Sequence, residues 1–512
     1  MRHAIVLCFA LCFMSLISWG QVEKASSAGC LETMDAHLAQ ERAELQAILA
    51  RHHSGQWVDG RLYGLPVNDF DDGTNLTVRQ RLEFRRMNPS LDYPTSGRVQ
   101  YPRWAFTFMN RLDRQGAVPC TGAPAQPQAQ DGLGLSQPAA LVIGPNINVS
   151  NDPTEPLSEQ FLAIDPVNAA FMVGASNIDL SGRGQMMYFS ADAGSTWSRV
   201  EIHPLRTNMS DPGVAFDSAG NVYTSTLDYT GNQTAVEVHK STDHGQTWPT
   251  RIVVDDASGN DKELFAVDYQ NASSCKDQIY VGWDNGHNQF VSSTTAPNSG
   301  VFAPKIVVQS KDFTIAGALA VGPPAAAGSP APVYYVWTDT KTKTINFSKS
   351  TNCGATWTPF KAIATTKNSF DTGIPAQCVR RALIYPSIDA DRSVSARRGW
   401  IYVVWNDFTA VQSNGCVATT DPNNNNIWYT RSADGGATWS TPAMLNANIA
   451  FADHFNQWMG VDDATGTIHV SWRDTRNDPN RVKTDVYYTN STDGLTFMPE
   501  VRITTAMSEV SS

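Results

Sequence analysis

The 512-residue sequence predicts an all-β fold: a six-bladed β-propeller over residues 141–512, preceded by a small, partly helical N-terminal region. Three observations support this prediction. A short box of Ser, Asp, Gly, Thr and Trp recurs along the chain, apolar strands recur in step with it, and only 17% of residues are charged, against about 25% in a typical soluble protein. These features favour many short strands joined by tight turns rather than helices.

The N-terminal part has three segments. Residues 1–20 combine a basic start, an apolar run and small residues before Gln21, which is typical of a secretory signal peptide. Residues 21–120 form a region of unassigned role, with helical spacing of apolar residues over 33–52. Residues 121–140 are rich in Pro, Gly, Gln and Ala and predict a linker.

The cysteines agree with export. Two of the eight lie in the signal segment, which leaves six for the mature chain, an even number suited to an oxidising compartment. None has the spacing of a zinc or redox motif. The positions of the cysteines in the predicted repeat favour three pairs: Cys30 with Cys120, Cys275 with Cys353, and Cys378 with Cys416.

The box is the strongest repeat. Three copies match closely, two are weaker and a decayed one spans 293–302, which makes six. In each box, Ser and Asp side chains are expected to bond backbone N–H groups of a turn, Gly to supply a positive φ, and the aromatic residue to enter the core. The five recognisable copies are Ser190–Trp197, Ser241–Trp248, Ser350–Trp357, Ser432–Trp439 and Ser491–Phe497.

The strands between the boxes give each unit its four-strand pattern. An apolar strand ending in Asp lies upstream of a box, followed by a strand such as Val333–Trp337 or Ile401–Trp405, and another strand follows the box, such as Arg251–Val254. An additional strand at Leu141–Ile143 is expected to help close the ring against the C-terminal end.

The boxes resemble the Asp-boxes, or BNR repeats, of the sialidase superfamily, and the resemblance covers residues 141–512. It implies that the boxes are structural and lie between the third and fourth strands, on the face opposite the functional one. The loops from second to third strands and from one blade to the next would then carry function. Members of the family hold a substrate carboxylate with three arginines and use a Tyr/Glu pair with an Asp acid/base.

The candidate functional residues are those expected on the face opposite the boxes. Tyr385 is expected to begin the innermost strand of the fifth blade, at the position held elsewhere by Phe161, Gly213, Leu264, Ala318 and Trp458. The candidate carboxylates are Glu263, Asp211, Asp371 and Asp453, and the expected catalytic set is Tyr385, Glu263, Asp453 and Asp211. The candidate substrate-binding residues are Arg206, Arg380, Arg381, Arg473 and Arg476. Each is weighed against the alternative of a solvated or internally paired charge.

The family's Arg-Ile-Pro motif is absent, so sialic acid is not the favoured substrate. We expect an exported, monomeric, sialidase-like glycoside hydrolase, secreted or periplasmic, that acts on an acidic or polyhydroxylated sugar. A non-catalytic propeller that binds a glycan or a protein is the alternative. No cofactor is expected, although the Asp-rich loops leave calcium as a candidate ligand. The net charge of −11 argues against nucleic acid, and no stretch after the signal segment has the length of a membrane span.

Overall fold

The computed structural model describes residues 144, 146–150, 157–178, 182–296, 298–310, 313–412 and 417–509, and four two-residue strands nearer the N-terminus. The chain divides into two compact units, residues 1–57 with 111–140 and residues 58–110 with 141–512, and every described strand belongs to the second unit. The predicted signal segment, the helix over 33–52 and the linker lie outside the described residues. The early strands are β1 (Arg61–Leu62), β2 (Leu65–Pro66), β3 (Phe70–Asp71) and β4 (Tyr101–Pro102).

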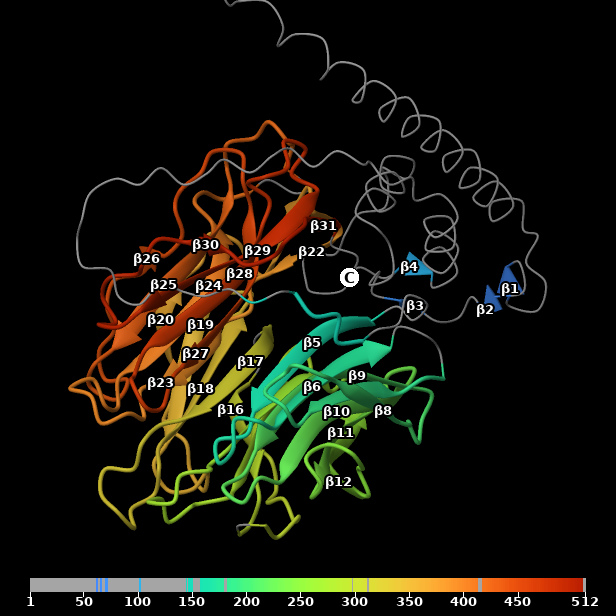
Figure 1. The fold of residues 1–512 in the computed structure, drawn as a ribbon, viewed down its shortest axis with the longest axis vertical. Helices are drawn as coiled ribbons and strands as arrows, with labels where there is room; N and C mark the ends of the chain where they lie inside the picture. Colours follow the sequence, from blue (N-terminus) through green and yellow to red (C-terminus); the bar gives the residue numbers. More distant parts are fainter. Residues whose placement is uncertain are drawn as a thin grey trace, which may run out of the picture. The chain divides into compact units, whose positions relative to one another are not determined.

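From residue 157 onwards the described strands form successive antiparallel sheets of four strands each, which are labelled in Figure 1. The first contains β5 (Leu157–Ile164), β6 (Met172–Ile178), β7 (Gln185–Ser190) and β8 (Ser198–Ile202). The second contains β9 (Asn208–Phe216), β10 (Val222–Thr230), β11 (Gln233–Ser241) and β12 (Thr250–Ser258). The third contains β13 (Asp261–Val267), β14 (Ile279–Asp284), β15 (Gln289–Ser293) and β16 (Ile306–Gln309).

The remaining sheets continue the pattern. The fourth contains β17 (Thr314–Val321), β18 (Val333–Asp339), β19 (Thr344–Ser350) and β20 (Lys361–Thr365). After the hairpin β21 (Asp371–Ile374) and β22 (Gln377–Leu383), the fifth contains β23 (Ser387–Ala390), β24 (Ile401–Phe408), β25 (Asn425–Ser432) and β26 (Ala443–Met444). The sixth contains β27 (His454–Val461), β28 (Ile468–Asp474), β29 (Lys483–Ser491) and β30 (Val501–Arg502), and β31 (Ser508–Glu509) pairs with β29.

The second strand of each sheet is buried on both faces because neighbouring sheets cover it. β18 and β24 are fully buried runs of β-branched and aromatic residues, as the sequence predicts for strands inside a stack of sheets. Four tryptophans at equivalent positions of these strands are at most 1% exposed: Trp283, Trp337, Trp405 and Trp472. Their burial fixes the distance between sheets.

The first strands of consecutive sheets contact one another in order, from β5 to β9, β13, β17, β23 and β27. The last sheet also contacts the first. The rings of Phe161 on β5 and Trp458 on β27 meet edge to face, with their centroids 5.0 Å apart. Asn146 adds a polar contact, since Thr505 donates its backbone N–H to the Asn146 side chain at 2.7 Å. The sheets therefore close into a ring, which is a propeller arrangement.

The boxes form turns between third and fourth strands. In the second sheet, the Asp243 carboxylate accepts hydrogen bonds from the Ser241 hydroxyl at 2.6 Å and the Thr247 backbone N–H at 2.9 Å. His244 and Gly245 both have positive φ, 57° and 91°, so two successive left-handed residues make the turn. The indole of Trp248 donates to the Gly245 carbonyl at 3.1 Å. We call the side of the ring that carries these turns the box face, and the opposite side the open face.

The disulfide predictions are confirmed where the described residues test them. Cys275 and Cys353 are bonded, with their Cα atoms 5.5 Å apart, and join the third sheet to the box turn of the fourth. Cys378 is also disulfide-bonded. Its predicted partner Cys416 and the predicted pair Cys30–Cys120 lie outside the described residues. In the described part of the chain, no apolar helix reaches membrane-spanning length.

A polar bridge links loops on the box face. The Tyr269 hydroxyl, which follows β13, donates to Asp463, which follows β27, at 2.5 Å. Arg392 donates to Asp463 at 2.7 Å, to Asp389 at 2.6 Å and to the Val321 carbonyl at 3.0 Å. The bridge therefore ties together loops of the third, fourth, fifth and sixth sheets.

Candidate functional site

The candidate site is built on a bulge that recurs in the innermost strands. In five of them the pairing register shifts by one residue, and in each case the first bulged residue has a positive φ between 48° and 61°. A bulge of this kind re-aims side chains at the end of a strand. The bulged residues are Glu159, Asp211, Lys262, Ala316 and Asn456.

Tyr385 occupies the equivalent position in the fifth sheet. Ser387 and Phe161 hold the same position in their strands, because each lies three residues before the end of its strand, β23 or β5. Ser387 pairs with Val404 and Phe161 pairs with Ala175. Counting back two residues from each aligns Tyr385 with Glu159. The expected alignment of Tyr385 with Phe161 and its counterparts is therefore wrong by two residues, since Ser387 is the residue that pairs in step with Phe161. We call Glu159, Asp211, Lys262, Ala316, Tyr385 and Asn456 the axial ring.

Charged members of the axial ring contact one another across the ring. The Lys262 ammonium lies 3.1 Å from an Asp211 oxygen and 3.6 Å from a Glu159 oxygen. It also lies 5.9 Å from the centroid of the Tyr385 ring. These residues come from the first, second, third and fifth sheets, so their side chains point to a common centre. Glu159 and Asp211 keep 22% and 12% of their side-chain surface exposed, and solvent or a ligand can therefore reach them.

The Asp211 carboxyl group holds its proton more readily than a free one. Burial raises the pKa of Asp211 to about 8, and the neighbouring charges of Glu159 and Asp261 and a hydrogen bond with Glu159 add to this shift against the opposing charge of Lys262. Asp211 is therefore protonated at neutral pH. Glu159 lies beside the same Lys262 ammonium.

Glu263 and Tyr385 add two further groups to the site. Glu263 is 1% exposed and neither of its carboxyl oxygens meets another residue within hydrogen-bond distance; burial, with the nearby charge of Asp211, raises its pKa well above the usual range. The Tyr385 hydroxyl is buried without a partner among the described residues, and burial raises its pKa as well. Both groups are therefore neutral in the free protein. The structure thus brings together Tyr385, Glu263 and Asp211 from the predicted catalytic set.

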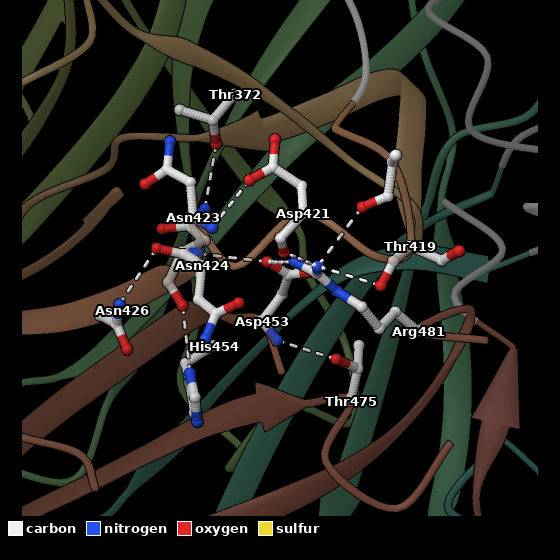
Figure 2. Close-up of polar contacts among 12 residues, drawn as sticks. Thr372, Thr419, Asp421, Asn423, Asn424, Asn426, Asp453, His454, Thr475 and Arg481 are labelled. Carbon is white, nitrogen blue, oxygen red and sulfur yellow. Dashed lines mark hydrogen bonds and ion pairs between the residues drawn. The ribbon is translucent and has the colours of Figure 1, made fainter. Parts of the chain in front are cut away.

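Asp453 lies elsewhere, in a buried network shown in Figure 2. Arg481 donates to both of its carboxylate oxygens, at 2.6 and 3.0 Å, and both side chains are fully buried. The same guanidinium donates to the Asp421 carbonyl at 2.7 Å, and the Asn425 backbone N–H donates to Asp453 at 3.1 Å. This network fixes the polar loop of the fifth sheet, and the geometry gives Asp453 a structural position rather than an accessible one. The Asp371 side chain lies outside the described residues.

Two of the predicted arginines, Arg206 and Arg476, are paired with carboxylates of their own. Arg206 is paired with Asp256 at 2.6 Å, and Arg476 with Asp474 at 2.6 Å and Glu500 at 2.5 Å. The guanidinium of Arg476 also lies 3.9 Å from the ring centroid of Tyr487. The charges of the predicted loop around Arg476 therefore neutralise one another, as the alternative interpretation expected.

The other arginines differ in their surroundings. Arg473, on β28, makes no ion pair within the described residues, and its one hydrogen bond is to the Thr484 hydroxyl at 3.4 Å; burial lowers its pKa. Arg381, on β22, is 9% exposed and has a positive φ of 75°. The Arg380 side chain lies outside the described residues. Arg473 is thus the predicted arginine whose charge is least neutralised by the described chain.

Sequence reasoning missed Glu159 and Lys262, although they contact the predicted residues directly. Their position along the strands was the available signal. Glu159 lies two residues before Phe161, and Lys262 lies two residues before Leu264. In the described residues, no group of three or more His, Cys, Asp or Glu side chains has the arrangement of a metal site.

Neither family models nor curated proteins match this sequence. Among solved structures, the NanB sialidase of Streptococcus pneumoniae is 8% identical, with 68% of this chain and 70% of that chain covered and a TM-score of 0.43. The BP39L lectin of Burkholderia pseudomallei is 10% identical over 67% and 84% of the two chains, with a TM-score of 0.44. The α-L-arabinofuranosidase Arb93A of Fusarium graminearum is 12% identical over 65% and 91%, with a TM-score of 0.41. The chain is thus similar at low identity to several solved proteins, sialidases among them.

Proposed function

We propose that this chain is an exported six-bladed β-propeller whose axial ring hydrolyses glycosides of a neutral, polyhydroxylated sugar. The observation that carries the proposal is the pair of adjacent carboxyl groups that share the Lys262 ammonium, Glu159 and Asp211, of which Asp211 has its pKa raised to about 8. A carboxyl group kept protonated near neutral pH beside a second carboxyl group is typical of acid/base catalysis. The disulfide between Cys275 and Cys353 supports export.

In the proposed reaction, protonated Asp211 donates its proton to the glycosidic oxygen while the bond from that oxygen to the anomeric carbon breaks. The Glu159 carboxylate attacks the anomeric carbon and forms a glycosyl ester. Asp211, now ionised, then takes a proton from water, whose oxygen displaces Glu159 and releases the sugar. Because the Asp211 and Glu159 carboxyl groups are hydrogen-bonded to one another, they are closer than the roughly 6.5–9.5 Å of inverting enzymes, and we expect retention of configuration.

A neutral sugar fits the charge of the site better than an anionic one. Glu159, Asp211 and Glu263 lie around the Lys262 ammonium, and two of the arginines expected to bind a substrate carboxylate, Arg206 and Arg476, are already paired with acids of the chain. The negative charge of an anionic substrate would also disfavour the ionised form of each of these acids. We therefore narrow the expected substrate class from acidic or polyhydroxylated sugars to polyhydroxylated neutral ones.

The test is a panel of 4-methylumbelliferyl glycosides that includes neutral hexosides, pentosides and a sialoside. We expect turnover of at least one neutral glycoside, with the anomeric configuration of the product retained by ¹H NMR, and a fall in kcat of at least about 100-fold in Glu159→Gln. Asp255→Asn is the matched control, because Asp255 pairs with Lys305 at 2.7 Å away from the axial ring. Turnover of none of the glycosides would contradict the proposal and favour non-catalytic glycan binding.

A further inference from the structure

A cavity of about 300 Å³ lies between the first and second sheets, away from the axial ring. β8, the outermost strand of the first sheet, supplies one wall, and β11, β12 and the box turn of the second sheet supply the others. No member of the axial ring lines it. Its polar and aromatic lining residues are Glu201, His203, His239, Trp248 and Arg251, with Leu205 beside them.

The apolar wall of the cavity is rigid. Trp248 is half-buried, and the hydrogen bond from its indole to the Gly245 carbonyl at 3.1 Å holds the ring in place. Leu205, beside it, is 73% exposed and its side chain can contact a ligand. An indole face next to an exposed aliphatic group offers a surface for the C–H face of a ligand ring.

Arg251 is the polar counterpart to this wall, and buried acids orient it. Its Nε donates to Glu237 at 2.5 Å, its Nη2 donates to Glu237 and to Asp228, the latter at 3.0 Å, and Glu237 is fully buried. Its Nη1 donates no hydrogen bond within the described residues. Because two carboxylates balance the guanidinium charge, the remaining N–H groups suit a neutral acceptor such as a hydroxyl group.

Glu201 and the two histidines complete the polar lining. Arg183 binds Glu201 through two nitrogens at 2.7–3.0 Å, and the Gly184 backbone N–H donates to it at 2.8 Å. His203 lies 3.5 Å from Glu201 and is 78% exposed, so its ring can reach a bound ligand. His239 lies 3.2 Å from Glu237 on the opposite side.

The cavity depends on residues that break the repeat. Arg251 is the third residue after the box tryptophan, and the equivalent positions in three other sheets hold Val200, Phe360 and Pro442. A structural role repeated in every sheet would not require this arginine. Concave sites of this size with an aromatic wall and a few oriented polar groups are typical of small-ligand binding.

We infer that this cavity binds a single neutral sugar residue, stacked on Trp248 with hydroxyl groups on Arg251 and His203. The inference is independent of hydrolysis at the axial ring. The site would hold a glycan next to the propeller whether or not the axial ring cleaves it.

The probe is an equimolar mixture of the methyl glycosides of glucose, galactose, mannose, fucose, arabinose and xylose at millimolar concentration, observed by saturation-transfer difference NMR. Measurements use the full chain carrying Asp211→Asn, so that turnover does not consume the probe. We expect saturation transfer to at least one glycoside, and a loss of about five-fold or more in Trp248→Ala. Trp197→Ala is the matched control, since Trp197 makes the same box hydrogen bond, at 2.9 Å to Gly194.

A second variant, His203→Ala with Leu205→Ala, covers the case in which Trp248→Ala does not fold, because both side chains are exposed and their loss leaves the core intact. It should weaken saturation transfer while the melting temperature stays unchanged. Transfer to none of the glycosides, or transfer that Trp248→Ala and the exposed double variant both leave intact, would overturn the inference. Hydrolysis by the wild type without saturation transfer at this cavity would leave the axial proposal standing alone.

Discussion

At the scale of single residues, the axial ring combines a repeated backbone with unrepeated side chains. Asp211 has a φ of 58° and Lys262 a φ of 48°, a region that non-glycine residues adopt at some energetic cost. The cost recurs in five of the described sheets, and at three of these positions, Glu159, Asp211 and Lys262, the side chain can bind or transfer a proton. The backbone thus supplies geometry and the side chains supply chemistry.

The protonation of Asp211 sets a pH limit on the proposed reaction. Its pKa is raised to about 8, so the proton donor is present below that pH and is lost above it. We expect kcat/KM for an unactivated glycoside to fall with an alkaline pKa near 8. In Asp211→Asn this limb should disappear and the rate should drop about 100-fold or more, while a substrate with a good leaving group loses much less. An equal loss for both kinds of substrate would argue against proton donation by Asp211.

Glu263 should make the fold sensitive to alkaline pH. Burial raises its pKa well above its unfolded value, so the stability associated with its neutral form is present at low pH and is lost as the pH rises through the folded pKa. Glu263→Gln removes this cost. We expect its melting temperature to match the wild type at pH 4 and to exceed it by about 2 °C or more at alkaline pH. A difference of the same size at both pH values would contradict titration of Glu263 as the cause.

At the scale of elements, the box turn is a self-contained hydrogen-bonded unit. Asp243→Ala removes the acceptors of the Ser241 hydroxyl and the Thr247 N–H, which should lower the free energy of unfolding by about 1 kcal/mol. Asp243→Asn should cost less, because the fourth sheet already uses Asn352, which accepts from the Thr356 N–H at 3.0 Å. Urea unfolding of the two variants measures the difference, and equal losses would contradict this account.

The elements were predictable because their causes are local. Each box carries its own hydrogen-bonding groups, and strands such as β24 contain runs of β-branched and aromatic residues that need no distant partner to be recognised. The axial ring was only partly predictable, since the sequence does not show that Ser387, two residues after Tyr385, is the residue that pairs in step with Phe161. Arg206 was predicted to bind substrate, but its counter-ion Asp256 comes from another strand of the sheet, 50 residues along the chain.

At the scale of the whole molecule, the disulfide joins neighbouring sheets across 78 residues of sequence. Replacing Cys275 and Cys353 together by alanine removes this constraint on the unfolded chain, and we expect the free energy of unfolding to fall by about 2–4 kcal/mol. Denaturant unfolding of the oxidised wild type and the double variant measures the loss. An unchanged midpoint in the double variant would show that the sheets hold together without the bond.

The bridge on the box face has a consequence for how a glycan would travel. In a ring of six sheets the third and sixth stand across the axis, so the hydrogen bond from Tyr269 to Asp463 crosses it, and Arg392 reinforces the crossing. A polysaccharide could not thread through such a ring from one side to the other. A substrate of the proposed axial site would therefore enter, and its product leave, on the open face.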